Sequence, residues 1–198
     1  KSISDQRLID FCTPVVFASN KTLNFYRKSM PDANFNYTSI KEFSKINPKQ
    51  VNIFNVWEEE VAISPGQLNE TGGKYALLSL QEATKALKEG FVDVLVTAPI
   101  NKYNIQSEEF KFPGHTDYLD KELEGNALML MVQDNLRVGL LTDHIPVNDV
   151  AEHLTEKLII QKLMLSQAEI DSLPITNDRI ESDIDNRIRY FQRQVGSV

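Results

Sequence analysis

The chain has 198 residues, of which 41% are hydrophobic and 25% charged, enough for one packed domain of ordinary size. Its formal net charge of −7, with no stripe of lysine and arginine, favours solubility and argues against a nucleic-acid partner. The single cysteine excludes an intrachain disulfide framework and favours a cytoplasmic setting, and no apolar run is long enough to predict a membrane span or a signal peptide.

The first third of the sequence predicts alternating helices and strands. An apolar run without polar alternation is typical of a strand buried on both faces. The first residues resemble the middle of a helix, which suggests that the chain is a fragment lacking its start. The expected elements are a helix within 1–12, a strand over 14–18, a helix capped by Ser19 or Asn20 and ending near Lys28, an irregular stretch over 31–48 and a strand over 51–56.

The remaining sequence predicts more α/β structure followed by a tail of different character. A glycine pair introduces a strong amphipathic helix, and the strand after it gives the helix-then-strand order of βαβ units. We expect a lobe over 1–171 and a linker with an amphipathic helical tail over 172–198. The expected elements are a helix over 74–89, strands over 92–96, 128–132 and 136–141 with a turn at Asp134-Asn135, a helix from about 148 to 164, and a tail helix whose stripe is Ile180, Ile184, Ile188 and Phe191.

Two of the three histidines lie in short polar loops after apolar runs. His115 stands in Pro-Gly-His-Thr-Asp, and His144 stands between Asp143 and a proline turn. Open α/β folds place their ligand sites at strand ends, and a histidine beside a carboxylate suits a metal ligand. The alternatives stay open: His144 could cap the following helix, and His115 and Thr116 could form only a turn and a helix cap.

Four segments in register carry a resemblance to a known family. They are 65–68 (PGQL), 96–102 (VTAPINK), 113–117 (PGHTD) and 144–150 (HIPVNDV). Together they resemble the 4-hydroxythreonine-4-phosphate dehydrogenase family of pyridoxal phosphate biosynthesis. The resemblance implies an α/β fold of three layers, α/β/α, like that of isocitrate and isopropylmalate dehydrogenases, present here in part.

The resemblance also implies an activity and its residues. The family oxidises a phosphorylated hydroxy amino acid with NAD and a divalent metal, and the product then loses CO2. By likeness, His115 and Thr116 bind substrate, His144 is a metal ligand, and Lys102 is the candidate catalytic residue or substrate contact. We therefore expect a metal that is Zn, Mg, Mn or Co, and a cytoplasmic homodimer with no membrane partner. No G-x-G-x-x-G motif is present, so NAD is expected from the likeness alone.

Some features depart from the family pattern. The N-terminal glycine-rich segment and two further metal histidines have no counterpart, and His153 does not match a ligand position. We expect the likeness to stop after about Leu165 and the chain to be an incomplete enzyme. A single histidine cannot complete a catalytic zinc site, which takes about three protein ligands. The alternative is a non-catalytic truncated lobe that acts as a protein-binding module through its terminal helix.

Overall fold

The computed structural model describes residues 5–29, 36–62, 64–125, 127–133, 136–142, 144–156 and 158–163. The chain divides into two compact units, Lys1–Leu123 and Glu124–Val198. The boundary predicted between 171 and 172 lies outside the described residues and stays a prediction, as do the linker, the tail helix and the turn at Asp134-Asn135.

The first unit is built on a parallel three-stranded sheet. Its strands are β1 (Val15–Ala18), β2 (Tyr37–Ile40) and β3 (Val51–Asn55), in the order β1-β3-β2. The central strand β3 has its first three residues buried, whereas β1 is only half-buried because it lies at an edge of this sheet. The strand β2 falls within the stretch expected to be irregular, so that prediction was wrong there. Its backbone is held by β3, with Tyr37 opposite Val51.

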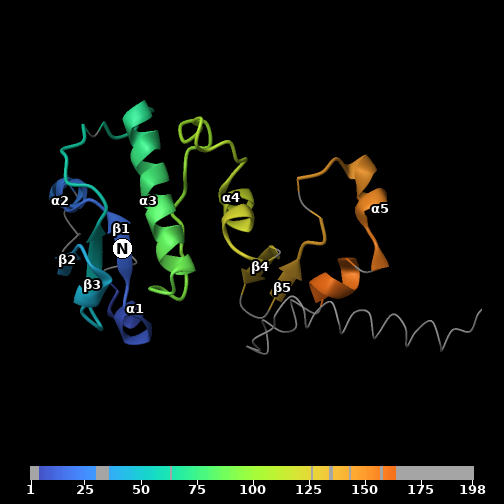
Figure 1. Cartoon of the computed structure of the whole chain (residues 1–198), viewed down its shortest axis with the longest axis horizontal. Helices are drawn as coiled ribbons and strands as arrows, with labels where there is room; N and C mark the ends of the chain where they lie inside the picture. The colour runs from blue at the N-terminus through green and yellow to red at the C-terminus, as the bar shows by residue number, and fades with distance from the viewer. Residues whose placement is uncertain are drawn as a thin grey trace, which may run out of the picture. The chain divides into compact units, whose positions relative to one another are not determined.

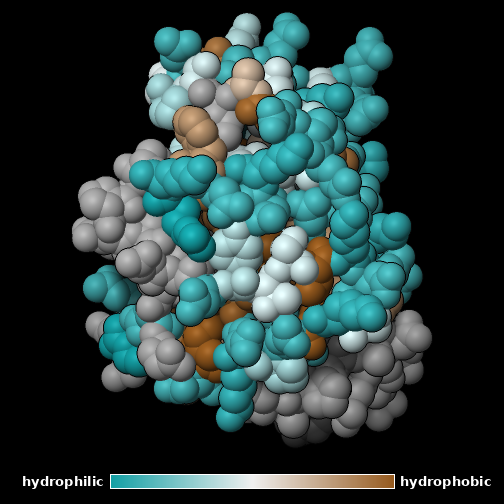
Figure 2. Space-filling view, turned by 90° about the vertical axis from the view of Figure 1, so that its left-hand side faces the viewer, coloured by the Kyte–Doolittle hydropathy of each residue, from teal (hydrophilic) through white to brown (hydrophobic). Residues whose placement is uncertain are grey.

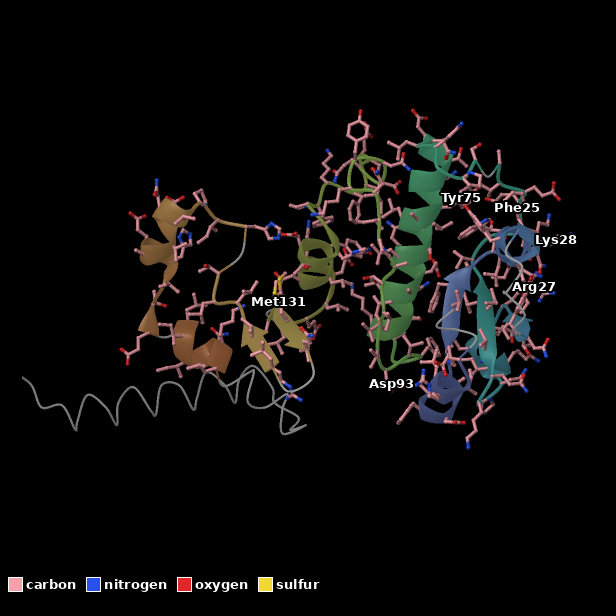
Figure 3. The ribbon with its side chains drawn as sticks, turned by 180° about the vertical axis from the view of Figure 1, so that it is seen from behind. Phe25, Arg27, Lys28, Tyr75, Asp93 and Met131 are labelled. Atoms are coloured by element: carbon pink, nitrogen blue, oxygen red, sulfur yellow. The ribbon has the colours of Figure 1, made fainter. Side chains whose placement is uncertain are left out.

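Helices cover both faces of this sheet, which confirms the α/β class (Figure 1). The sheet lies between α2 (Asn20–Ser29) and α3 (Glu70–Lys88), as both Figure 1 and Figure 3 show. The short α1 (Gln6–Phe11) precedes β1, a 3-10 turn η2 (Phe43–Lys45) follows β2, and α4 (His115–Glu122) ends the unit. The side of the molecule drawn in Figure 2 is mostly hydrophilic, with small apolar patches between the polar side chains.

The long helix α3 begins four residues before its predicted start. Asn69 caps it, since its Oδ1 accepts a hydrogen bond from the backbone N–H of Gly72 at 2.6 Å. The glycine pair therefore lies inside the first turn of the helix rather than before it. The apolar stripe was predicted correctly, because Leu77, Leu80 and their neighbours along it are buried.

A cluster of buried side chains attaches α4 and the preceding loops to α3. It consists of Leu77, Leu80, Ile105, Phe110 and Tyr118, all at most 6% exposed. The Tyr118 ring lies 5.4 Å from the rings of both Phe110 and Phe112. Burying such side chains stabilises the fold by about 1.5–3 kcal/mol each, so the cluster holds the loop between α3 and α4 in place.

The predicted strand over 92–96 is wrong. All five residues are described, and none pairs with a strand. Val94 is 75% and Val96 88% exposed. An apolar run predicts burial, but a strand forms only where another strand supplies its hydrogen-bonding partner.

The second unit contains a two-stranded antiparallel hairpin of β4 (Leu130–Gln133) and β5 (Leu136–Gly139), as predicted. Seven of its eight residues are exposed, so these are not buried strands. The helix expected from 148 to 164 is interrupted. A 3-10 turn η3 (Val147–Asp149) leads into α5 (Val150–His153), and a further helical stretch covers the described residues 158–163. Among the helices described, none is both long enough and apolar enough to cross a bilayer.

Candidate functional site

The candidate site in the first unit depends on the loop that follows residue 100. Asn101 closes this loop as a turn, because its side-chain Oδ1 accepts hydrogen bonds from the N–H groups of Tyr103 and Asn104 at 3.1 and 2.9 Å. Ile105, which is 2% exposed, then enters the core. Lys102 lies between these two fixed points, so its backbone is held while its side chain stays exposed.

Gly73 of α3 allows this loop to come close. A Cβ atom at position 73 would lie 2.0 Å from the backbone oxygen of Asn104 and 2.9 Å from its carbonyl carbon. No larger residue fits without moving one of the two backbones. The glycine pair was expected only to introduce a helix, and its second member instead sets the distance between α3 and the Lys102 loop.

The structure brings Lys102 to the start of α4. A Cβ atom built on Gly114 would lie 3.7 Å from Lys102 Cε and 3.9 Å from Lys102 Nζ. Gly114 is the N-cap residue of α4, and having no side chain it makes no side-chain cap hydrogen bond. An ammonium group therefore lies beside the N-terminus of an eight-residue helix that begins with His115 and Thr116. Backbone N–H groups, the helix dipole and a lysine are the elements of an anion site.

Packing fixes α4 in this position. Tyr118 anchors it in the core, and Glu122 at its far end accepts a hydrogen bond of 2.8 Å from Lys88 of α3. Burial raises the pKa of Tyr118, partly offset by a hydrogen bond with Thr84. His115, the first residue of α4, is half-buried. Desolvation lowers the pKa of His115, which favours its neutral form.

Asp117 is a site residue to which the sequence assigned no role beyond its place in the motif. Its Oδ2 atom is buried and has no hydrogen-bond partner in the described structure. Buried carboxylate oxygens are usually paired, so this atom lacks the hydrogen bond that such atoms normally make. The signal in the sequence was only an acidic residue in the first turn of a helix, which by itself indicates helix stabilisation.

His144 belongs to the second unit and has an unusual backbone. Its φ is +55°, in the left-handed region that a residue with a Cβ atom seldom adopts, and its side chain is exposed. Strained positions of this kind cluster at functional sites. Its neighbour Asp143 lies outside the described residues. His153 has its Nδ1 2.8 Å from the backbone oxygen of Asp149, four residues earlier, so its ring is held against its own helix.

The described donors do not complete a metal site. Across the ranges that the structure covers, no three histidine, cysteine, aspartate or glutamate side chains converge. His144 offers one nitrogen ligand, whereas catalytic zinc takes about three protein ligands.

Comparison with known proteins decides the family. The family described as "Pyridoxal phosphate biosynthetic protein PdxA" matches residues 10–181. The chain belongs to this family. The match extends past Leu165 to residue 181, so the expectation that the likeness stops there was wrong.

Relatives and solved structures agree with this assignment. The 4-hydroxythreonine-4-phosphate dehydrogenase of Bacteroides thetaiotaomicron is 39% identical over 83% of this chain and 46% of its own length. That of a Sulfurihydrogenibium species is 31% identical over 78% of this chain and 48% of its own length. The chain thus spans about half the length of these relatives.

Two solved structures share the fold at lower identity. The 4-hydroxythreonine-4-phosphate dehydrogenase of Burkholderia phymatum has a TM-score of 0.72 and 22% identity, covering 85% of this chain and 52% of that one. The corresponding enzyme of Klebsiella pneumoniae has a TM-score of 0.65 and 21% identity, covering 79% and 49%. At this identity the likeness establishes the fold.

Proposed function

We propose that this chain forms the substrate-binding part of a 4-hydroxythreonine-4-phosphate dehydrogenase. In this proposal Lys102, His115 and Thr116 hold the anionic part of 4-phosphooxy-threonine or a related phosphorylated hydroxy acid at the start of α4. The observation that carries the proposal is the Lys102 ammonium beside Gly114, where the helix begins without a side-chain cap.

The chemistry of these groups suits a phosphorylated substrate. The first N–H groups of α4 point toward its N-terminal end, where an anion accepts their hydrogen bonds. Lys102 supplies a full positive charge, and the Thr116 hydroxyl can donate or accept. The neutral form of His115, favoured by burial, can accept a proton from a substrate hydroxyl through an unprotonated ring nitrogen.

His144 is proposed as one ligand of a divalent cation, which is Zn, Mg, Mn or Co. The described residues do not fit a complete site, so the remaining ligands would come from beyond them or from a second copy of the chain. When bound, the cation supplies a Lewis acid for the hydroxyl that is oxidised. The cofactor NAD, the homodimeric state and the cytoplasmic location are part of the same proposal, supported by family membership.

One observation favours a second function. The hairpin of the second unit exposes apolar side chains. Such a surface suits a non-catalytic lobe that binds another protein. The two functions differ in one measurable property, since only the first requires that a phosphorylated hydroxy acid bind at α4.

The test is isothermal titration of the full chain with 4-phosphooxy-threonine. Lys102→Gln removes the positive charge beside α4 and should weaken binding about tenfold to a hundredfold, because a charge-assisted hydrogen bond contributes about 1.5–3 kcal/mol. Lys85→Gln makes the same change at an exposed position of α3 and should leave the affinity unchanged. Equal binding by both variants, or no binding by the unaltered chain, would reject the substrate assignment.

Metal binding is tested separately by titrating the full chain with zinc chloride. His144→Ala should abolish or weaken uptake, whereas His153→Ala should not, because the His153 ring is engaged with its own helix. Identical uptake by the two variants would reject His144 as a ligand.

A further inference from the structure

The helix α4 (Figure 1) begins without the side-chain cap that helices commonly have. An N-cap side chain accepts a hydrogen bond from the second or third N–H group of the helix, and Ser, Thr, Asp and Asn are the preferred residues. Asp5 and Asn69 do this for α1 and α3. The N-cap residue of α4 is Gly114, which has no side chain to offer. The first turn of α4 therefore depends on an acceptor from elsewhere, which is water or a ligand.

No other side chain among the described residues takes the place of the cap. A capping box would use the acid at the third helical position, Asp117, to accept a hydrogen bond from the N-cap N–H group. Its Oδ2 atom is buried without a partner instead. The first N–H group of this stretch with a backbone acceptor is that of Tyr118, which donates to the Gly114 oxygen at 3.3 Å. The N–H groups of residues 115–117 thus have no acceptor in the described structure.

The backbone of Gly114 does not explain why a glycine stands at this position. Its φ of −177° is extended, and residues of any kind adopt it. A Cβ atom there would lie 3.7 Å from Lys102 Cε and 3.9 Å from Lys102 Nζ, which are ordinary van der Waals contacts. A serine would therefore fit, and it would cap the helix. What glycine adds is a set of open N–H groups.

The charge beside this N-terminus favours an anionic occupant. Among the described residues no carboxylate forms an ion pair with Lys102, whereas Lys88 is paired with Glu122 at the other end of α4. Open N–H groups, the positive end of the helix dipole and an ammonium group together attract an anion that carries several acceptor oxygens.

We propose that Gly114 is a specificity-determining residue of this site, because its lack of a side chain lets an anionic group of the ligand become the N-cap of α4. This inference rests on the proposed function, which places a phosphorylated hydroxy acid at the start of α4. Tyr118 and the Lys88–Glu122 pair already fix the rest of the helix, so the ligand completes only its first turn. A capping side chain and the ligand then compete for the same N–H groups.

The first test compares Gly114→Ser with Gly114→Ala, which differ by one oxygen atom. Both add a Cβ atom beside Lys102, but only serine can cap the first turn. In urea unfolding of the free chain, the serine variant should have the higher midpoint. In isothermal titration with 4-phosphooxy-threonine, it should bind about fivefold more weakly than the alanine variant, which is the equilibrium equivalent of one helix cap. Opposite changes in stability and affinity separate this effect from structural damage, which would lower both.

The outcomes of this test distinguish the two levels of the argument. Equal affinity in the serine and alanine variants would overturn the role of Gly114, as would a serine variant no more stable than the alanine variant. No binding by the unaltered chain would reject the proposed function, and with it the ligand as the cap.

The second test measures backbone amide hydrogen exchange of residues 115–117 by NMR. In the unaltered chain 4-phosphooxy-threonine should slow this exchange severalfold, and Gly114→Ser should slow it without any ligand. The amides of the central strand β3, residues 51–55, serve as the internal control and should not change. Binding of the ligand without slower exchange at 115–117 would show that the ligand is not the cap.

Discussion

Substituting alanine for Gly73 should displace the loop that carries Lys102. The added methyl group would lie 2.0 Å from the backbone oxygen of Asn104 and 2.9 Å from its carbonyl carbon. Favourable contacts between such atoms are about 3.5 Å long. The loop or the helix must therefore move apart by more than about 1 Å to relieve the overlap. Both atoms belong to the backbone and cannot rotate away.

The magnitude follows from opposing effects. Alanine in a helix interior is favoured over glycine by about 1 kcal/mol. Overpacking costs about 1–3 kcal/mol, and lifting Ile105, now 2% exposed, away from the core forfeits part of the roughly 2 kcal/mol from its burial. We therefore expect Gly73→Ala to lower the free energy of unfolding of the first unit by about 2 kcal/mol.

Equilibrium unfolding in urea measures this change through Trp57, the single tryptophan of the chain. Its ring is buried and lies 4.7 Å from that of Tyr75 on α3, so its fluorescence reports the packing of the first unit. Gly72→Ala is the matched control. Its nearest neighbour is a side-chain atom, Asn69 Oδ1 at 3.0 Å, which can rotate. Rotation weakens the cap hydrogen bond to Gly72 by about 1 kcal/mol, and the higher helix preference of alanine offsets this loss, so the net change should stay within about 1 kcal/mol.

A contrary result would be unambiguous. If Gly73→Ala were more stable than the unaltered chain by about 1 kcal/mol, helix propensity alone would account for it, and close approach of the loop would be refuted. If stability fell as expected but affinity for 4-phosphooxy-threonine did not change, the loop would pack on α3 without positioning Lys102 for binding.

Three further predictions concern the first unit. Because burial lowers the pKa of His115, the unfolded chain binds its proton more readily, so stability should fall as pH drops below about 6.5, and His115→Gln should remove that part of the slope. Tyr118→Ala should cost about 3–5 kcal/mol of unfolding free energy by opening the core cluster. Asn52→Ala should cost about 2–3 kcal/mol, since the fully buried Asn52 side chain makes three hydrogen bonds with the backbone of Asn47 and Gln50.

Each of these is read from urea unfolding curves, with a matched variant for the last two. An unchanged pH slope in His115→Gln would contradict the assignment. Tyr118→Phe should lose about 1 kcal/mol, and a loss as large as that of alanine would contradict a packing role. Ser39→Ala on the exposed side of β2 should be neutral, whereas a loss equal to that of Asn52→Ala would show that the buried hydrogen bonds are not the cause.

Local patterns in the sequence were sufficient for the helix α3 and for the strands β1, β3, β4 and β5. An apolar stripe at helical spacing and short apolar runs depend on neighbours along the chain, so they can be read directly from it. The four motifs likewise indicated the family, since their order and letters are properties of the sequence alone.

The strand assignments that failed depend on distant residues. β2 forms because the backbone of Tyr37 and its neighbours pairs with the backbone of β3, although the flanking residues are mostly polar. The stretch 92–96 is apolar but has no strand beside it among the described residues, and Val96 is 88% exposed. Whether a segment becomes a strand depends on a neighbouring strand, which cannot be identified from the local sequence pattern.

The candidate site shows the same division between sequence and tertiary structure. The sequence by itself determined which groups are available: the lysine at 102, the histidine and threonine that open α4, and the histidine at 144. Only the tertiary structure brought Lys102 to Gly114, because Gly73 admits the backbone of Asn104 and Ile105 anchors the loop in the core. Contacts between residues distant in sequence depend on how surfaces fit, and that fit arises only when the chain packs.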